Sequence, residues 1–405
     1  MAVNLRPLPE LAPVDGVRCA TVPAGVRYPG RDDLVLFALD PEATTAAVFT
    51  RNRFRAAPVR LAERHLEAAA PRFLLVNTGN ANAGTGARGD ADALSCCEAL
   101  ARAAGVDASA VLPYSTGVIG ERLPAERIVD AIPALLEGLA ADGWARAARG
   151  ILTTDTAPKG ACRTGIGPRG WTLTGIAKGA GMIRPDMATM LSFIATDAPV
   201  PRNVLRQMLG RAADRSFHRI TIDGDTSTND AVTLVATGRA GGAPIDSADS
   251  AEAAALQMAL DELCMELAQA VVRDGEGATR FVTMEVGGAR TGDEALDCAY
   301  TIAESPLVKT ALFAGDPNWG RLLAAIGRSG MDDLDVAGVS IHLDDVLIAE
   351  QGGVAEGYRE EDGARIMAQP EIRIRVDLGR GEARETVWTT DLSYEYVRIN
   401  AEYRS

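Results

Sequence analysis

The chain of 405 residues has few of the side chains that build metal sites and disulfide frameworks. It contains three histidines, His65, His218 and His342, and neither a Cys-x-x-Cys nor a His-Glu-x-x-His spacing. Its six cysteines, two of them adjacent at Cys96 and Cys97, match no disulfide pattern, so we expect reduced and mostly buried thiols. The sequence therefore predicts no metal and no metal-bound cofactor.

Positive charge and long apolar runs are also scarce. The formal net charge is −14, and no run of five basic residues occurs, which argues against a nucleic-acid or anionic-membrane surface. No uninterrupted apolar run approaches the ~18 residues of a membrane-spanning helix, and the N-terminus lacks the apolar core of a signal peptide. We expect a soluble, cytoplasmic protein that binds neither nucleic acid nor membrane.

The scarcity of histidine also bears on catalysis. His65 lies in Ala-Glu-Arg-His-Leu-Glu, which is typical of a solvated helix face. No Gly-x-Ser-x-Gly segment forms a nucleophile elbow, although a Ser-His-Asp triad assembled from distant residues stays open. Few histidines favour a nucleophile that carries its own base.

Hydrophobic periodicity predicts interleaved helices and strands. Apolar residues at three- and four-residue spacing predict helices over 90–104, 202–216 and 251–273, and apolar runs predict strands at 73–76 and 231–237. From residue 335 the pattern changes to short alternating strands, such as 339–343 and 371–376, which predicts a C-terminal subdomain over 331–405. The interleaving predicts an α/β or α+β class.

The most informative segment runs Lys178-Gly-Ala-Gly-Met-Ile-Arg-Pro-Asp-Met-Ala-Thr-Met-Leu191. Here Thr189 follows the small residue Ala188 at the start of an apolar run. A threonine hydroxyl needs a base beside it, and cutting the chain before the threonine would free an α-amine for that work. The alternative, which spacing alone favours, is a glycine-rich turn that leads into a buried strand.

This segment resembles the signature of the ornithine acetyltransferase family, also called glutamate N-acetyltransferase, of arginine biosynthesis. Further segments resemble family blocks in family order: 77–86, 115–120, 153–156, 223–226, 274–279, 315–320 and 400–405. The resemblance covers nearly the whole chain. It implies a sandwich of sheets between helix layers, analogous to N-terminal-nucleophile hydrolases but with its own connectivity.

The resemblance also implies residue roles. The chain would be cut between Ala188 and Thr189, and Thr189 would carry the acetyl group. Thr116 and Gly117 would form the oxyanion hole through a hydroxyl and a backbone N–H. The substrate-binding residues would be Thr153, Lys178, Thr189, Glu276, Asn400 and Ser405. Without the family, Thr116 and Gly117 would be interpreted as a strand-ending turn, Lys178 as a solvated loop lysine and Glu276 as part of a helix C-cap.

We therefore expect a ping-pong acetyltransferase that moves an acetyl group from N2-acetyl-L-ornithine to L-glutamate without a cofactor. Acetyl-CoA is kept as a second candidate donor. The rival hypotheses are an N-terminal-threonine aminopeptidase or amidase, which would pass the acyl group to water, and an uncut, non-catalytic binding protein. The resemblance further implies an alpha chain over 1–188, a beta chain with its nucleophile half at 189–330, and an α2β2 assembly.

Overall fold

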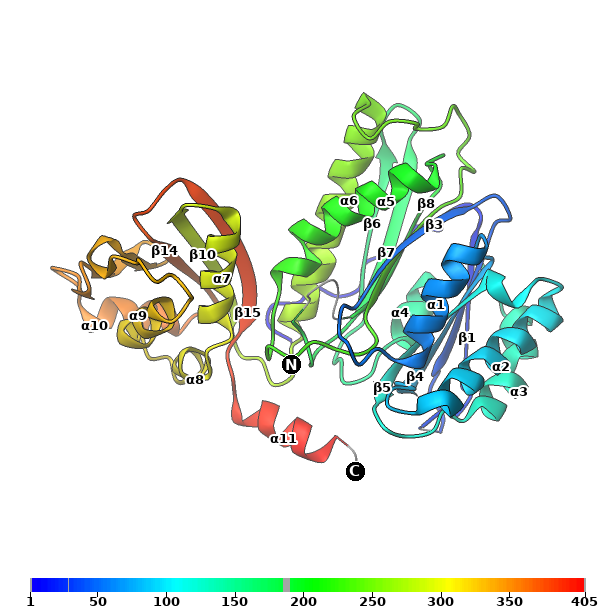
Figure 1. Cartoon of the computed structure of the whole chain (residues 1–405), viewed down its shortest axis with the longest axis horizontal. Helices are drawn as coiled ribbons and strands as arrows, with labels where there is room; N and C mark the ends of the chain where they lie inside the picture. Colours follow the sequence, from blue (N-terminus) through cyan, green and yellow to red (C-terminus); the bar gives the residue numbers. More distant parts are fainter. Residues whose placement is uncertain (1, 28, 185–189, 404–405) are drawn as a thin grey trace.

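The computed structural model describes residues 2–27, 29–184 and 190–403 of the chain (Figure 1). Two of its three sheets face each other. The first has the order β1 (Val17–Val22), β2 (Leu34–Leu39), β4 (Phe73–Asn80) and β5 (Val111–Val118). The second has the order β3 (Thr44–Phe49), β9 (Ala231–Ala236), β8 (Leu191–Thr196), β7 (Trp171–Lys178) and β6 (Lys159–Ile166).

Aromatic side chains join the facing sheets. Phe37 of β2 stacks on Phe193 of β8 with ring centroids 4.9 Å apart, and Tyr114 of β5 meets Phe193 edge-on at 5.0 Å. Helices α2 (Gly86–Ala104) and α3 (Ala125–Glu137) cover the outer face of the first sheet, and α5 (Arg202–Arg215) and α6 (Ala251–Arg273) cover that of the second (Figure 1). The predicted sandwich of sheets between helix layers is thus confirmed.

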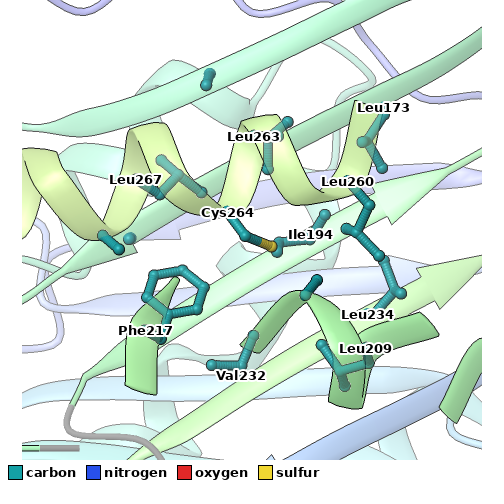
Figure 2. Close-up of a cluster of buried hydrophobic side chains, with 14 of the residues drawn as sticks. Leu173, Ile194, Leu209, Phe217, Val232, Leu234, Leu260, Leu263, Cys264 and Leu267 are labelled. Atoms are coloured by element: carbon teal, nitrogen blue, oxygen red, sulfur yellow. The ribbon is translucent and has the colours of Figure 1, made fainter. Parts of the chain in front are cut away.

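Helix α6 shows why the outer layers hold. Leu260, Leu263, Cys264 and Leu267 recur at three- and four-residue spacing and pack, with α5, on the second sheet (Figure 2). Ser250 caps the helix by accepting the N–H of Ala253 at 3.1 Å. Truncating one of these leucines to alanine would cost about 2–5 kcal/mol. The predicted helix over 251–273 has the bounds of α6.

Two shorter helices, α1 (Ala57–Ala68) and α4 (Trp144–Gly150), flank the sandwich. His65 of α1 is buried, and its Nδ1 lies 2.7 Å from the carbonyl oxygen of Val111 at the start of β5. The prediction of a solvated His65 was wrong, because the charged neighbours Arg64 and Glu67 face the solvent while His65 faces the strand. Single 3-10 turns occur at Ala108–Ala110, Phe217–Arg219 and Val336–Gly338.

The third sheet forms a separate C-terminal lobe (Figure 1). Its order is β13 (Gly353–Val354), β12 (Val346–Glu350), β11 (Ser340–Leu343), β14 (Glu371–Asp377), β10 (Phe281–Ala289) and β15 (Ala383–Thr390), with α7 (Gly292–Ala303), α8 (Pro306–Ala314), α9 (Trp319–Gly327) and α10 (Glu360–Met367). In β14 the buried Ile372, Ile374 and Val376 alternate with exposed charged residues, as the sequence pattern predicted. Because β10 belongs to this sheet, the lobe extends N-terminally past residue 331.

After β15 the chain returns to the sandwich through α11 (Tyr394–Glu402), which runs below the lobe towards the body (Figure 1). Ser393 caps α11 by accepting the N–H of Tyr396 at 3.3 Å, and the helix has no buried residue of its own. No helix among the described residues is long and apolar enough to span a membrane. The position of α11 brings the C-terminal segment to the edge of the sandwich.

Candidate active site

A cavity of about 270 Å³ lies where β5 and β7 end and β8 and β9 begin. Six predicted site residues line it: Thr116, Gly117, Thr153, Lys178, Glu276 and Asn400. Met190, which follows Thr189 in the sequence, lines it as well. The predicted cleavage site at Ala188 and Thr189, and Ser405, lie outside the described residues. The structure therefore brings together every predicted site residue that it describes.

The end of β5 has a conformation that requires glycine. Gly117 has φ +135°, and a Cβ at this position would lie 2.5 Å from the backbone nitrogen of Asn80. The close approach follows from a bulge in the parallel β4–β5 pair, where Asn80 is opposite both Thr116 and Val118. This geometry places the Thr116 side chain and the Gly117 backbone in the cavity wall.

Lys178, the last residue of β7, interacts directly with this loop. Its Nζ donates to Oγ1 of Thr116 at 3.1 Å. Because an ammonium group can only donate, the Thr116 oxygen is the acceptor, and the hydroxyl proton is left to bond another group. Lys178 is opposite Leu191 in the β7–β8 ladder, so it also lies beside the chain that follows Thr189.

The charge of Lys178 depends on four neighbouring groups. Burial lowers the pKa of Lys178, and the adjacent Lys159 lowers it further, whereas Asp155, Asp230 and Glu276 raise it. Lys178 is 8% exposed and lines the cavity.

Glu276 and Asn400 form a second polar wall. The N–H of Glu276 donates to the carbonyl oxygen of Ala180 at 2.8 Å, and Nδ2 of Asn400 donates to Oε2 of Glu276 at 2.7 Å. A Cβ on Gly181 would lie 2.5 Å from Cδ of Glu276, so only glycine allows this carboxylate its position. Asn400 comes from α11, so the C-terminal segment completes the wall.

A third wall was not predicted as part of the site. Nδ2 of Asn229 donates to the carbonyl oxygens of Ala81 at 2.6 Å and Ser115 at 2.9 Å, which links the start of β9 to β5 and to the loop after β4. Burial raises the pKa of the neighbouring Asp230 well above its usual value, against the opposing effects of Ser227 and Lys178. Within the described part of the chain, Oδ2 of Asp230 has no hydrogen-bond partner. An Asn-Asp pair just before an apolar strand was the available sequence signal.

Asp155, Lys159 and Asp274 were also missed as site residues. They form a fully buried ion cluster directly behind the cavity. Asp155 and Asp274 lie within segments that resemble the family, but nothing in the sequence pairs them with Lys159. In residues 2–27, 29–184 and 190–403 no group of three or more His, Cys, Asp and Glu side chains could hold a metal ion.

A model of the ArgJ family matches residues 18–405. The chain belongs to the ArgJ family. Over its whole length it is 56% identical to the arginine biosynthesis bifunctional protein ArgJ of Pseudomonas syringae pv. tomato, which is itself covered completely. The chain is therefore an acetyltransferase of arginine biosynthesis, as the resemblance predicted.

Two solved structures of ArgJ proteins are similar to parts of the chain. The first is the crystal structure of arginine biosynthesis bifunctional protein ArgJ from Bacillus halodurans, which is 38% identical with a TM-score of 0.50. The match covers 53% of this chain and 100% of the Bacillus halodurans chain. The second is the structure of ornithine acetyltransferase complexed with ornithine from Mycobacterium tuberculosis, which is 37% identical with a TM-score of 0.42. The match covers 45% of this chain and 98% of the Mycobacterium tuberculosis chain.

Proposed function

We propose that this ArgJ chain is a glutamate N-acetyltransferase that moves the acetyl group of N2-acetyl-L-ornithine to L-glutamate through an acetyl-Thr189 intermediate. The observation that carries the proposal is the contact between Lys178 and Thr116 beside Gly117, in a cavity that is also lined by Met190. Acyl transfer needs hydrogen-bond donors aimed at a developing oxyanion next to a nucleophile. Met190 follows Thr189 directly, which supports Thr189 as that nucleophile.

In the first half-reaction, Oγ of Thr189 attacks the acetyl carbonyl carbon, and its own α-amine takes the hydroxyl proton. The carbonyl oxygen becomes an oxyanion that accepts from the Thr116 hydroxyl and the Gly117 N–H. The donation from Lys178 to Thr116 polarises that hydroxyl and turns its proton towards the oxyanion. The carbon–nitrogen bond then breaks, the ornithine nitrogen takes the proton from the Thr189 ammonium, and ornithine leaves.

The second half-reaction reverses these steps with glutamate. The unprotonated α-amine of glutamate attacks the acetyl carbon of the ester, and the same two donors hold the oxyanion. The bond between that carbon and Oγ of Thr189 then breaks, and the proton of the attacking nitrogen passes through the Thr189 α-amine to Oγ. N-acetylglutamate leaves, and the free threonine is restored. Acetyl-CoA remains a candidate donor for the first half-reaction.

The walls suit two amino acids whose side chains carry opposite charges. Two of the three donors of the Lys178 ammonium are not used by Thr116 and can bind an α-carboxylate. Glu276 can accept from the side-chain ammonium of ornithine, whereas the Asn400 amide that now bonds Glu276 can instead donate to the side-chain carboxylate of glutamate. Thr153 completes the lining.

The proposal includes cleavage of the chain between Ala188 and Thr189, because an amide nitrogen before Thr189 cannot act as a base. The solved Bacillus halodurans chain is covered completely by 53% of this chain, which is close to the share made up by residues 189–405 and so supports a cut at this point. The halves 1–188 and 189–405 would stay together because β7 and β8 pair across the cut. Native mass spectrometry tests the further proposal that they assemble as α2β2.

The first experiment is denaturing mass spectrometry of the purified wild type, Thr189→Ala and Thr189→Ser. We expect two fragments with a new N-terminus at Thr189 in the wild type and one uncut chain in Thr189→Ala. Thr189→Ser keeps a hydroxyl and should be cut. A single uncut wild-type chain that still transfers acetyl groups would overturn the free-amine mechanism.

The second experiment separates the transferase from the aminopeptidase or amidase. Incubation with N2-acetylornithine should release ornithine continuously only when glutamate is present, and without glutamate the fragment that begins at Thr189 should gain one acetyl group. Parallel double-reciprocal lines are expected for the two substrates. Glutamate-independent release of acetate would instead support the hydrolase.

A further inference from the structure

A buried ion cluster lies behind the cavity wall and takes no part in the steps proposed above. Nζ of Lys159 lies 2.7 Å from Oδ1 of Asp155 and 2.6 Å from Oδ2 of Asp274, and it also donates to the carbonyl oxygen of Ala157 at 3.2 Å. The three charged side chains are completely shielded from solvent. Because a buried ion pair pays for its desolvation and is a weak source of stability, such a cluster calls for another role.

Asp155 connects two walls of the cavity. Its Oδ2 accepts the N–H of Thr153 at 3.0 Å, and its Oδ1 accepts the N–H of Gly179 at 2.7 Å. Thr153 and Gly179 both line the cavity, and Gly179 directly follows Lys178. One carboxylate therefore sets the distance between the loop that carries Thr153 and the strand end that carries Lys178.

Asp274 connects the second wall, which carries Glu276. It accepts the N–H of Thr156 at 2.9 Å, the N–H of Ala157 at 3.3 Å and the Thr156 hydroxyl. It stands at the C-terminal end of α6, two residues before Glu276. Lys159 thus joins two carboxylates. Asp155 holds the segments that carry Thr153 and Lys178, and Asp274 lies at the base of the segment that carries Glu276.

The cluster also carries a surplus negative charge, because two carboxylates face one ammonium. The charged groups that face Lys178 are Asp155 from the loop before β6, Lys159 from β6, Asp230 from the start of β9 and Glu276 from the segment after α6. Among the carboxylates in this set, burial raises the pKa of Asp230 and so favours its neutral form. Asp155 is then a principal source of negative charge for Lys178.

We propose that Asp155, Lys159 and Asp274 form a positioning cluster for the acetyl-transfer site. The cluster fixes the three segments that carry Thr153, Lys178 and Glu276 relative to one another, and it favours the ammonium form of Lys178. The inference rests on the proposed function, since that function gives the three walls their shared ligand. None of the three residues touches the cavity, so the cluster acts through its neighbours. Its effect should therefore appear in ligand binding and in the pH dependence of binding.

The test uses the full chain and the binding of ornithine by isothermal titration calorimetry, which needs no turnover. Asp155→Asn keeps the shape of the side chain but removes its charge and one acceptor. We expect the Kd for ornithine to rise about tenfold or more, which corresponds to about 1.4 kcal/mol. Because less negative charge then supports the Lys178 ammonium, weakening of binding with rising pH should begin at lower pH than in the wild type.

Two further variants grade the effect. Asp274→Asn removes the carboxylate on the far side of Lys159. Among the described residues, this carboxylate bonds Thr156, Ala157 and Lys159, none of which lines the cavity, so its effect should be smaller but of the same sign. Asp40→Asn is the matched control, because Asp40 is also a buried carboxylate that pairs with a cation, Arg239, and accepts a backbone N–H. This pair follows the C-terminal ends of β2 and β9, whereas the cavity lies at the start of β9. Asp40→Asn should lower thermal stability without moving the Kd or its pH dependence.

The outcomes are distinct. Equal losses of thermal stability in Asp155→Asn, Asp274→Asn and Asp40→Asn, with unchanged ornithine binding and pH profile, would overturn the proposal and leave a purely structural cluster. If Asp155→Asn does not fold, Asp274→Asn decides by the same readout. Ornithine binding by a wild type without glutamate-dependent acetyl transfer would count against the proposed function, while the graded order of Kd values would still test the cluster.

Discussion

Lys159 and Lys178 lie on neighbouring strands of the same sheet, and both are buried, yet their surroundings differ. Lys159 Nζ meets two carboxylates and a carbonyl oxygen, and the residue is 2% exposed. Among the described residues, the one hydrogen bond that Lys178 Nζ makes is to the neutral hydroxyl of Thr116, and the residue lines the cavity. The protein neutralises the first cation itself, whereas under the proposed function the second is left to bind a ligand. Burial alone therefore does not distinguish the two lysines.

The largest expected effect on stability comes from removing the neutralised cation, Lys159. Lys159→Met leaves Asp155 and Asp274 buried without their cation, so we expect the free energy of unfolding to fall by about 3–5 kcal/mol. Chemical denaturation measures it. Arg398→Met, which removes an exposed cation that pairs with Glu395 and Glu402, should cost at most about 1 kcal/mol. Similar losses in both variants would contradict the contrast.

Lys178→Met tests the other side. Removing the ammonium should lower kcat/KM for acetyl transfer by a factor of about 10² to 10³, because the Thr116 hydroxyl loses its orientation and the oxyanion loses a well-placed donor. The free energy of unfolding should change by less than about 1 kcal/mol, since the one hydrogen bond lost among the described residues is to a neutral hydroxyl. Steady-state kinetics with denaturation of the same sample checks both. A variant that is unstable but keeps its activity would reverse the assignment.

Lys309, the remaining lysine, extends the comparison to the C-terminal lobe. Its Nζ donates to Oγ1 of Thr389 at 3.0 Å and to the carbonyl oxygen of Thr390, and burial lowers its pKa to about 8. Above this pH the folded chain releases a proton that the unfolded chain keeps until about pH 10.5, so this lysine adds stability as the pH rises through that window. The gain amounts to about 3 kcal/mol.

The measurement is the difference in unfolding free energy between the wild type and Lys309→Met at several pH values from 7 to 10. The difference cancels the titration of other groups, and it should shift in favour of the wild type as the pH rises. A pH-independent difference would mean that Lys309 keeps an ordinary pKa in the fold.

The last prediction, for Asp230→Asn, is one of direction. Burial raises the pKa of this carboxyl, so the folded chain holds a proton that the unfolded chain has lost. The free energy of unfolding of the wild type therefore falls as the pH rises above about 4. An amide has the shape of the protonated acid. Thermal unfolding should therefore show Asp230→Asn gaining stability relative to the wild type between pH 4 and 7. A loss that grows over that range would identify Asp230 as a charged partner of Lys178.

Secondary structure was predictable where periodicity governs packing. The bounds of α6 and the alternation in β14 follow from apolar spacing alone. The helix predicted from residue 90 in fact begins at Gly86, because contacts within the preceding loop override the low helix propensity of glycine. Nδ2 of Asn82 donates to the carbonyl oxygen of Gly89, and a Cβ on Gly89 would overlap the Thr85 hydroxyl.

The site was predictable as a set of residues but not as an arrangement. Family likeness named Thr116 and Lys178, yet their contact arises from packing two sheets against each other. Lys159 and Asp274 are 115 positions apart, and neither spacing nor composition signals that they pair. Asp230 escaped notice because its unusual state depends on burial at the start of β9, which a local pattern does not contain.

The burial of all three lysines makes the folded protein an unusual subject for amine chemistry. Lys159 and Lys309 are each 2% exposed with bonded ammonium groups, and Lys178 opens only into the cavity. A bulky amine-reactive ester applied under native conditions would thus react poorly with every lysine side chain. Unfolding exposes all three lysines, so the number of side-chain labels incorporated per molecule would report the loss of the fold.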